Sequence, residues 1–77
     1  MSNGKQASPR KQLILLRKKV GSQRKVASDL NISETYLRLL EKGKAQPSVE
    51  LLFRTAHYLE SDVYTCWPDL AGEAPKK

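Results

Sequence analysis

Residue types that build catalytic and metal sites are nearly absent from this 77-residue chain. It has one histidine, His57, and one cysteine, Cys66, and neither has a partner at metal-ligand or catalytic spacing. It also has no glycine-rich phosphate loop and no Ser/His/Asp set. We therefore expect no enzyme, no catalytic residue, no metal, no cofactor and no small-molecule ligand.

Disulfide pairs and long hydrophobic runs are missing as well. A lone cysteine excludes an internal disulfide and fits a reducing compartment, where Cys66 serves as a small apolar filler. No apolar run approaches the roughly 18 residues needed to span a bilayer, and no signal-peptide pattern is present. We expect a soluble cytoplasmic protein with no membrane contact.

Positive charge is what the chain has in excess. The formal net charge is +6 and the pI about 9.7. Residues 1–46 hold eleven Lys/Arg against three acids, a net of +8, whereas residues 47–77 hold three against five, a net of −2. A basic half beside a mildly acidic half favours a polyanion such as nucleic acid as the partner.

The pattern of caps and breaks predicts one all-α domain of five short helices over residues 8–68. Residues 1–7 are expected to form a flexible N-terminal arm and residues 69–77 a flexible C-terminal tail. Ser8 is the expected cap of a first helix that begins at Pro9 and runs to about Val20.

The first helix has a broad apolar face. Leu13, Leu16 and Val20 form its expected inward stripe. Ile14 and Leu15 widen that stripe and serve either the core or a partner. Its basic residues lie elsewhere, and Arg10 and Lys11 are free to follow a nucleic-acid backbone.

Residues 22–43 have the layout of a DNA-reading helix-turn-helix. Ser22 caps a helix whose apolar face is Val26, Ala27 and Leu30. Residues 31–33 break it: Asn31 tolerates the left-handed conformation of a helix exit, Ile32 can fill the core, and Ser33 can cap the next helix. The second helix runs from Glu34 to Lys42 before Gly43 ends it. Arg24 and Lys25 open the first of these helices, where they either form a solvated turn or join Gln23 and the amides in gripping a phosphate.

Two further helices complete the predicted domain. Ser48 caps a helix with a buried face of Leu51, Leu52, Thr55, Ala56 and Leu59. After a corner at residues 60–61, Asp62 caps a brief helix to about Trp67, which Pro68 stops.

Together these residues resemble the Cro and phage-repressor, or Xre-like, helix-turn-helix family over about residues 13–67. The resemblance rests on Ser22-Gln23, Ala27, Ile32-Ser33, Leu40-Glu41-Lys42-Gly43-Lys44, Pro47-Ser48, Leu51-Leu52, Ala56 and Leu59. It implies a compact five-helix repressor-like domain that binds double-stranded DNA as a homodimer on pseudo-palindromic operators and regulates transcription.

The resemblance also assigns residue roles. It implies that Gln23 bonds a phosphate and braces the start of the reading helix, and that Glu41 is structural, with Arg17 as its partner. The predicted base-reading residues are Ser33, Glu34, Thr35, Arg38 and Leu39. The predicted phosphate-binding residues are Ser22, Gln23, Arg24, Lys25, Tyr36, Lys42, Lys44 and Gln46.

Two departures from the family pattern stand out. The link at Gly21-Ser22 is one residue shorter than in many members, and Glu60 stands where the family often has glycine.

A second hypothesis is an antitoxin-like adaptor or interaction module on the same bundle, with Ile14, Leu15, Phe53 and Tyr58 as its partner surface.

Overall fold

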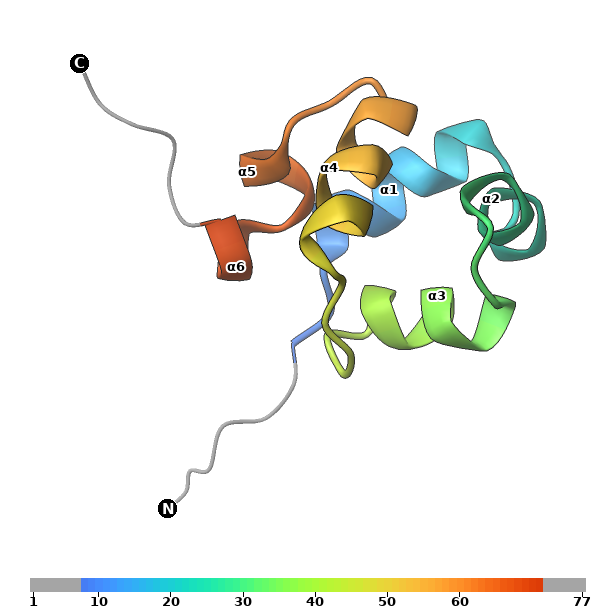
Figure 1. Cartoon of the computed structure of the whole chain (residues 1–77), viewed down its shortest axis with the longest axis horizontal. Helices are drawn as coiled ribbons and strands as arrows, with labels where there is room; N and C mark the ends of the chain where they lie inside the picture. The colour runs from blue at the N-terminus through green and yellow to red at the C-terminus, as the bar shows by residue number, and fades with distance from the viewer. Residues whose placement is uncertain (1–7, 72–77) are drawn as a thin grey trace.

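A computed structural model of the chain describes residues 8–71, in which short helices pack against one another around a common core (Figure 1). The expected arm at residues 1–7, and residues 72–77 of the expected tail, lie outside the described residues. The helices are α1 (Lys11–Val20), α2 (Gln23–Leu30), α3 (Glu34–Glu41), α4 (Val49–Tyr58), α5 (Val63–Cys66) and α6 (Pro68–Ala71).

Side-chain caps fix where four of these helices begin. Ser22, Ser33, Ser48 and Asp62 each accept a hydrogen bond from the backbone N–H three residues on, at 3.1, 2.9, 3.1 and 2.8 Å. Each bond satisfies one amide that the helix itself leaves unpaired. Four of the five predicted caps are therefore confirmed.

The break between α2 and α3 has the predicted chemistry. Asn31 adopts the left-handed conformation at φ 61°, and its N–H bonds back to the end of α2. Ile32 is half-buried and packs against both parts of the core, and Ser33 turns the chain into α3. This short turn holds α2 and α3 against each other.

The core has two parts that meet at Ile32 and Tyr58. One, formed by Val26, Ala27, Leu30 and Leu37, joins α2 to α3. The other surrounds the completely buried Trp67 and Cys66. Trp67 donates its indole N–H to the Leu52 carbonyl at 3.0 Å, so the one polar atom of this large side chain is satisfied. Burial raises the pKa of the Cys66 thiol.

The start of the first helix differs from the prediction. The helix begins at Lys11, with Arg10 at the cap position and no side-chain cap, so the prediction of Ser8 as cap and Pro9 as first helical residue is wrong. Arg10 is 4% exposed and does not face solvent. The segment is pulled away from helical geometry because the Arg10 N–H bonds the Glu41 carbonyl at 2.8 Å.

The inward face of α1 is also narrower than expected. Leu13 is buried and Leu16 half-buried, but Val20 is 40% exposed and Arg17 is buried in its place. The side chain of Arg17 turns inward because it reaches a buried carboxylate on α3. Ile14 is half-buried, whereas Leu15 is 53% exposed and lies outside the core.

The C-terminal end of the domain reaches further than predicted. Pro68 begins a sixth short helix rather than ending the ordered chain, and residues 69–71 belong to it. These three residues were assigned to the expected tail. Asp69 is held there by an ion pair with Arg10, 59 residues away in sequence.

Gly43, at the end of α3, combines two constraints. Its φ is +78°, and a Cβ placed on it would collide with the Ser8 carbonyl oxygen of the segment before α1. Only glycine satisfies both the left-handed backbone and this close approach.

We predict that Gly43→Ala lowers the free energy of unfolding by roughly 1–3 kcal/mol, from backbone strain and the clash with Ser8. Urea unfolding measures the change. Gly21→Ala is the matched control, because the φ of Gly21 is extended and its Cβ would meet only the flexible Lys25 side chain. The control is expected to stay within about 0.5 kcal/mol of wild type, and equal losses in both variants would contradict this account.

Candidate nucleic-acid interface

The helix α3 lies along one edge of the bundle and presents one face to solvent (Figure 1). Its inward side chains are Leu37, Leu40 and Glu41, all buried. The predicted base-reading residues lie between these buried residues at helical spacing, on the other face of the helix. Ser33, Glu34, Thr35 and Arg38 are exposed, and Leu39 is half-buried.

A buried ion pair anchors the end of α3. Arg17 donates from Nε to Glu41 Oε2 at 2.7 Å and from Nη2 to Oε1 at 3.0 Å, so the pair is bidentate. The hydrogen bond to Glu41 raises the pKa of Arg17. The prediction that Glu41 is structural and bonded to Arg17 is confirmed.

Gln23 joins the same network. Its side-chain amide donates to Glu41 Oε1 at 2.9 Å, which ties the first turn of α2 to the last turn of α3. The expected brace is therefore present, but it acts at the end of the reading helix and not at its start. The second amide hydrogen of Gln23 has no partner among the described residues, so its phosphate role stays a prediction.

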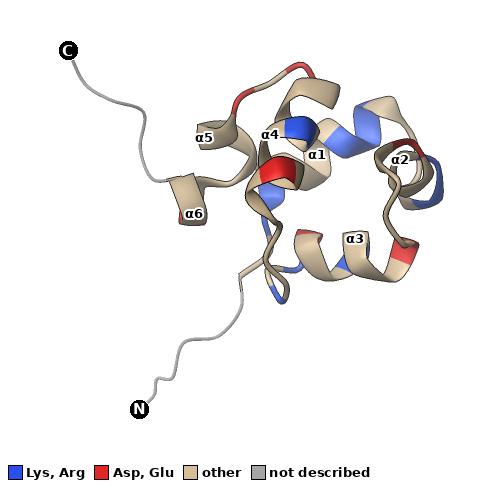
Figure 2. Cartoon of the chain, in the orientation of Figure 1, with Lys and Arg blue, Asp and Glu red and all other residues tan. Residues whose placement is uncertain are grey.

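Four cations around α3 are uncommitted. Within residues 8–71, the side chains at these positions are exposed and form no ion pair: Arg24, Arg38, Lys42 and Lys44. In Figure 2 basic segments lie on α1, α2, the middle of α3, the loop after α3 and α4, while acidic segments lie at both ends of α3, on α2 and α4, and in the loop from α4 to α5. The basic character predicted from the first half of the chain is thus displayed beside the exposed face of α3.

The other predicted phosphate ligands already have partners in the protein. The Ser22 hydroxyl accepts from the Lys25 amide, and the Lys25 ammonium bonds Asp29 at 2.9 Å. Tyr36 donates its hydroxyl hydrogen to the Gln46 carbonyl at 2.6 Å. To bind phosphate, Lys25 must share or exchange its partner, whereas Arg24 need not.

Asp29 links two elements besides pairing with Lys25. It accepts a hydrogen bond from the Tyr58 hydroxyl of α4. The bonds from Tyr58 and Lys25 lower the pKa of Asp29, and the same bonds raise the pKa values of both partners. Tyr58 is thus engaged within the bundle, which removes it from the partner surface of the second hypothesis.

Arg10 is a buried polar residue at the centre of a hydrogen-bond network, so the prediction that it is free to follow a nucleic-acid backbone is wrong. All five N–H groups of its guanidinium are bonded, to Asp69, the Leu40 and Ala45 carbonyls and the Gln46 side chain. Its charge also lies 5.1 Å from the centre of the Trp67 ring. No local sequence signal identifies it, because its charged partner Asp69 is 59 residues away.

A groove of about 920 Å³ runs past this cluster, lined by residues of α1, α6 and the segment after α3. Within residues 8–71, no group of three or more His, Cys, Asp or Glu could hold a metal ion. None of the helices in that range has the length and apolarity to cross a membrane.

A short bundle in which two capped helices meet at a tight turn, the second exposed and flanked by free cations, defines a helix-turn-helix DNA-binding domain. Comparison with known protein families gives the same result: residues 13–64 match the helix-turn-helix family HTH_3. The chain belongs to this Cro/C1-type, Xre-like family of non-enzymatic DNA-binding domains. The corresponding comparisons with curated proteins and with solved structures found no match.

We predict that Glu41→Gln lowers the free energy of unfolding by about 3 kcal/mol, because Arg17 is left buried without a counter-charge. Chemical denaturation checks this value. Glu50→Gln is the matched control, since its ion pair with Arg54 lies at the surface, and its loss should not exceed about 0.5 kcal/mol. Similar losses for the two variants would show that burial does not set the importance of the Glu41 pair.

Proposed function

We propose that the protein is a sequence-specific transcriptional regulator that inserts α3 into the DNA major groove. The observation that carries this proposal is the exposed face of α3, whose opposite face is locked to α1 and α2 through Glu41. A rigid, eight-residue helix with free polar side chains is suited to a groove about 12 Å wide.

The exposed side chains differ in chemistry, which favours sequence reading over simple adhesion. Arg38 can donate two hydrogen bonds to guanine O6 and N7, and Glu34 can accept from cytosine N4. Thr35 and Ser33 can bond base edges, and Thr35 can also touch a thymine methyl. Leu39, half-buried, offers the exposed part of its side chain to a methyl group.

We assign binding of the DNA phosphate backbone first to the cations that form no ion pair among the described residues. Arg24 extends from the first turn of α2, and Lys42 and Lys44 follow α3, so the three flank the reading helix at both ends of the motif. The α2 N-terminus, with Ser22, Gln23 and Lys25, adds amide donors that favour an anion. Tyr36 and Gln46 complete the set beside Lys44.

We further propose that a homodimer occupies a pseudo-palindromic operator in the cytoplasm and represses by blocking polymerase. Two reading helices one DNA turn apart, about 34 Å, would match such a site. On α4, Val49 is 73% and Phe53 58% exposed, and their i,i+4 spacing places them on one helix face. This apolar face is available for the second copy.

The same apolar face gives the second hypothesis its support. If Phe53 binds a different protein, the bundle is an adaptor and not a regulator. Leu15 on α1 is similarly exposed, whereas Tyr58 is bonded to Asp29 and Ile14 is half-buried. The two hypotheses differ in whether the exposed face of α3 is needed for function.

Selection from a random duplex pool is expected to return one enriched motif. Raising salt from 50 to 200 mM should weaken binding roughly 10³–10⁵-fold if the dimer neutralises about 6–10 phosphates. No enrichment over random duplex would defeat the proposal.

Arg38→Ala should relax the preference for one base pair of the selected motif, by about 1–3 kcal/mol. Lys19→Ala is the control, because it removes the same charge from an exposed position of α1 and should leave base preference intact.

Phe53→Asp is expected to weaken binding to a two-half-site operator while leaving single-half-site binding unchanged, because it disrupts only pairing of the copies. Leu15→Asp is the control for an added charge at an exposed leucine. Mobility shifts on both DNAs measure the effect. An in-cell phenotype lost with Phe53→Asp but kept with Thr35→Ala and Arg38→Ala would favour the adaptor hypothesis.

A further inference from the structure

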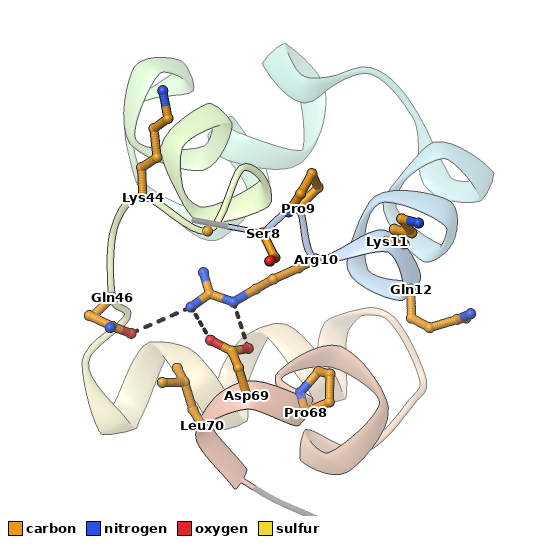
Figure 3. A pocket seen from close by; sticks show the side chains of 11 residues that line it. Ser8, Pro9, Arg10, Lys11, Gln12, Lys44, Gln46, Pro68, Asp69 and Leu70 are labelled. Carbon is orange, nitrogen blue, oxygen red and sulfur yellow. Dashed lines mark hydrogen bonds and ion pairs between the residues drawn. The ribbon is translucent and has the colours of Figure 1, made fainter. Parts of the chain in front are cut away.

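The guanidinium of Arg10 holds both sides of the segment that carries Lys44. It donates from Nη1 to the Leu40 carbonyl at 2.6 Å, at the end of α3, and to the Ala45 carbonyl at 3.0 Å. It also donates from Nη2 to the Gln46 side chain at 3.4 Å (Figure 3). The chain before and after Lys44 is thereby fixed to one planar group.

Asp69 supplies the negative charge that makes this arrangement stable. Its carboxylate accepts hydrogen bonds from Arg10 Nε at 3.0 Å and from Arg10 Nη2 at 2.9 Å, so the pair is bidentate. The hydrogen bond from Arg10 lowers the pKa of Asp69. The Arg10 side chain is only 3% exposed, whereas that of Asp69 is 52% exposed. Among the described residues, no other carboxylate bonds Arg10, so without Asp69 a buried cation would have no counter-charge.

The segment itself has few other supports. The Lys44 amide bonds the Leu39 carbonyl at 2.9 Å, and the Tyr36 hydroxyl bonds the Gln46 carbonyl. Lys44 and Gln46 are exposed, and α4 begins only at Val49. Three of the five guanidinium bonds of Arg10 are made to Leu40, Ala45 and Gln46, so this one side chain sets where the segment lies relative to α3.

We propose that Arg10 and Asp69 are positioning residues for DNA binding. They hold residues 44–46 beside α3, where the Lys44 side chain can contact a phosphate of the DNA backbone. This inference rests on the proposed function and extends it to two residues that do not touch DNA. As a consequence, α6 influences DNA binding by the segment after α3 through one ion pair, the one between Asp69 and Arg10.

Charge makes the inference sharply testable, because two effects have opposite signs. Asp69→Asn raises the formal net charge from +6 to +7. Long-range electrostatics alone would then leave DNA binding unchanged or tighten it. Loss of positioning instead weakens binding, since Lys44 no longer meets its phosphate.

The experiment compares Asp69→Asn with Glu60→Gln on the operator selected by the wild type. Glu60 is exposed and forms no ion pair with the described residues, so Glu60→Gln makes the same charge change away from the segment. We expect about a tenfold loss for Asp69→Asn, the equivalent of one charge-assisted hydrogen bond. The slope of log K against log salt should fall in magnitude by about 0.9 for each bound copy, because each copy loses one phosphate contact. Asp69→Glu should recover part of the loss.

Two further measurements separate positioning from general instability. Binding is measured at a temperature where circular dichroism shows every variant fully folded. In a Lys44→Ala background, Asp69→Asn should cost little more, because the contact through which it acts is already gone. Amide hydrogen exchange at Lys44, without DNA, should accelerate in Asp69→Asn and not in Glu60→Gln.

The outcomes are distinguishable. If the wild type binds no operator, the proposed function and this inference both fail. If the wild type binds and Asp69→Asn behaves like Glu60→Gln, only the inference is overturned. Additive losses in the Lys44→Ala background would likewise overturn it, by showing that Asp69 acts elsewhere.

Discussion

The buried pair of Arg17 and Glu41 is the interaction on which the rest of the interface depends. Burying two charges costs free energy unless each finds a well-placed partner, and here the carboxylate receives two bonds from Arg17 and one from Gln23. These bonds join α1, α2 and α3 at one point. Any rotation of α3 about its axis would break them, so they fix which of its faces points outward.

This anchoring matters because α3 is short. Isolated helices of fewer than about 12 residues are marginal in water, and α3 has eight. Its conformation is therefore a property of the bundle: the Ser33 cap begins it, Leu37 and Leu40 hold its middle, and Glu41 holds its end. The exposed face of α3 is therefore preorganised, so binding through it, as proposed, would not carry the entropy cost of ordering a helix.

Local chemistry explains which parts of the fold were predictable. Caps at Ser22, Ser33 and Ser48, and the left-handed Asn31, act within four residues and are visible in sequence. The start of α1 was mispredicted because Ser8-Pro9 satisfies the local rule, while two distant partners hold Arg10: its N–H bonds the Glu41 carbonyl and its side chain pairs with Asp69. Helical spacing identified Leu13 but not the exposure of Val20, because an arginine with a buried partner can replace an apolar residue on an inward face.

The candidate site shows the same division. Exposure of Ser33, Glu34, Thr35 and Arg38 follows from helical periodicity once the buried face is known. Partners made across the fold do not: nothing local indicates that Tyr36 bonds the Gln46 carbonyl or that Lys25 is paired with Asp29. Sequence thus located the reading helix, while only the three-dimensional contacts separate free cations from committed ones.

The complete burial of Cys66 has a practical consequence. A thiol that is 0% exposed beside Trp67, with its pKa raised by burial, is protected from alkylation while the bundle is closed. Because it is the single cysteine of the chain, its modification rate reports on one event, the opening of the α4–α5 end of the molecule. The rate at which an alkylating reagent modifies Cys66, followed by mass spectrometry, therefore measures how often the native bundle opens at this end.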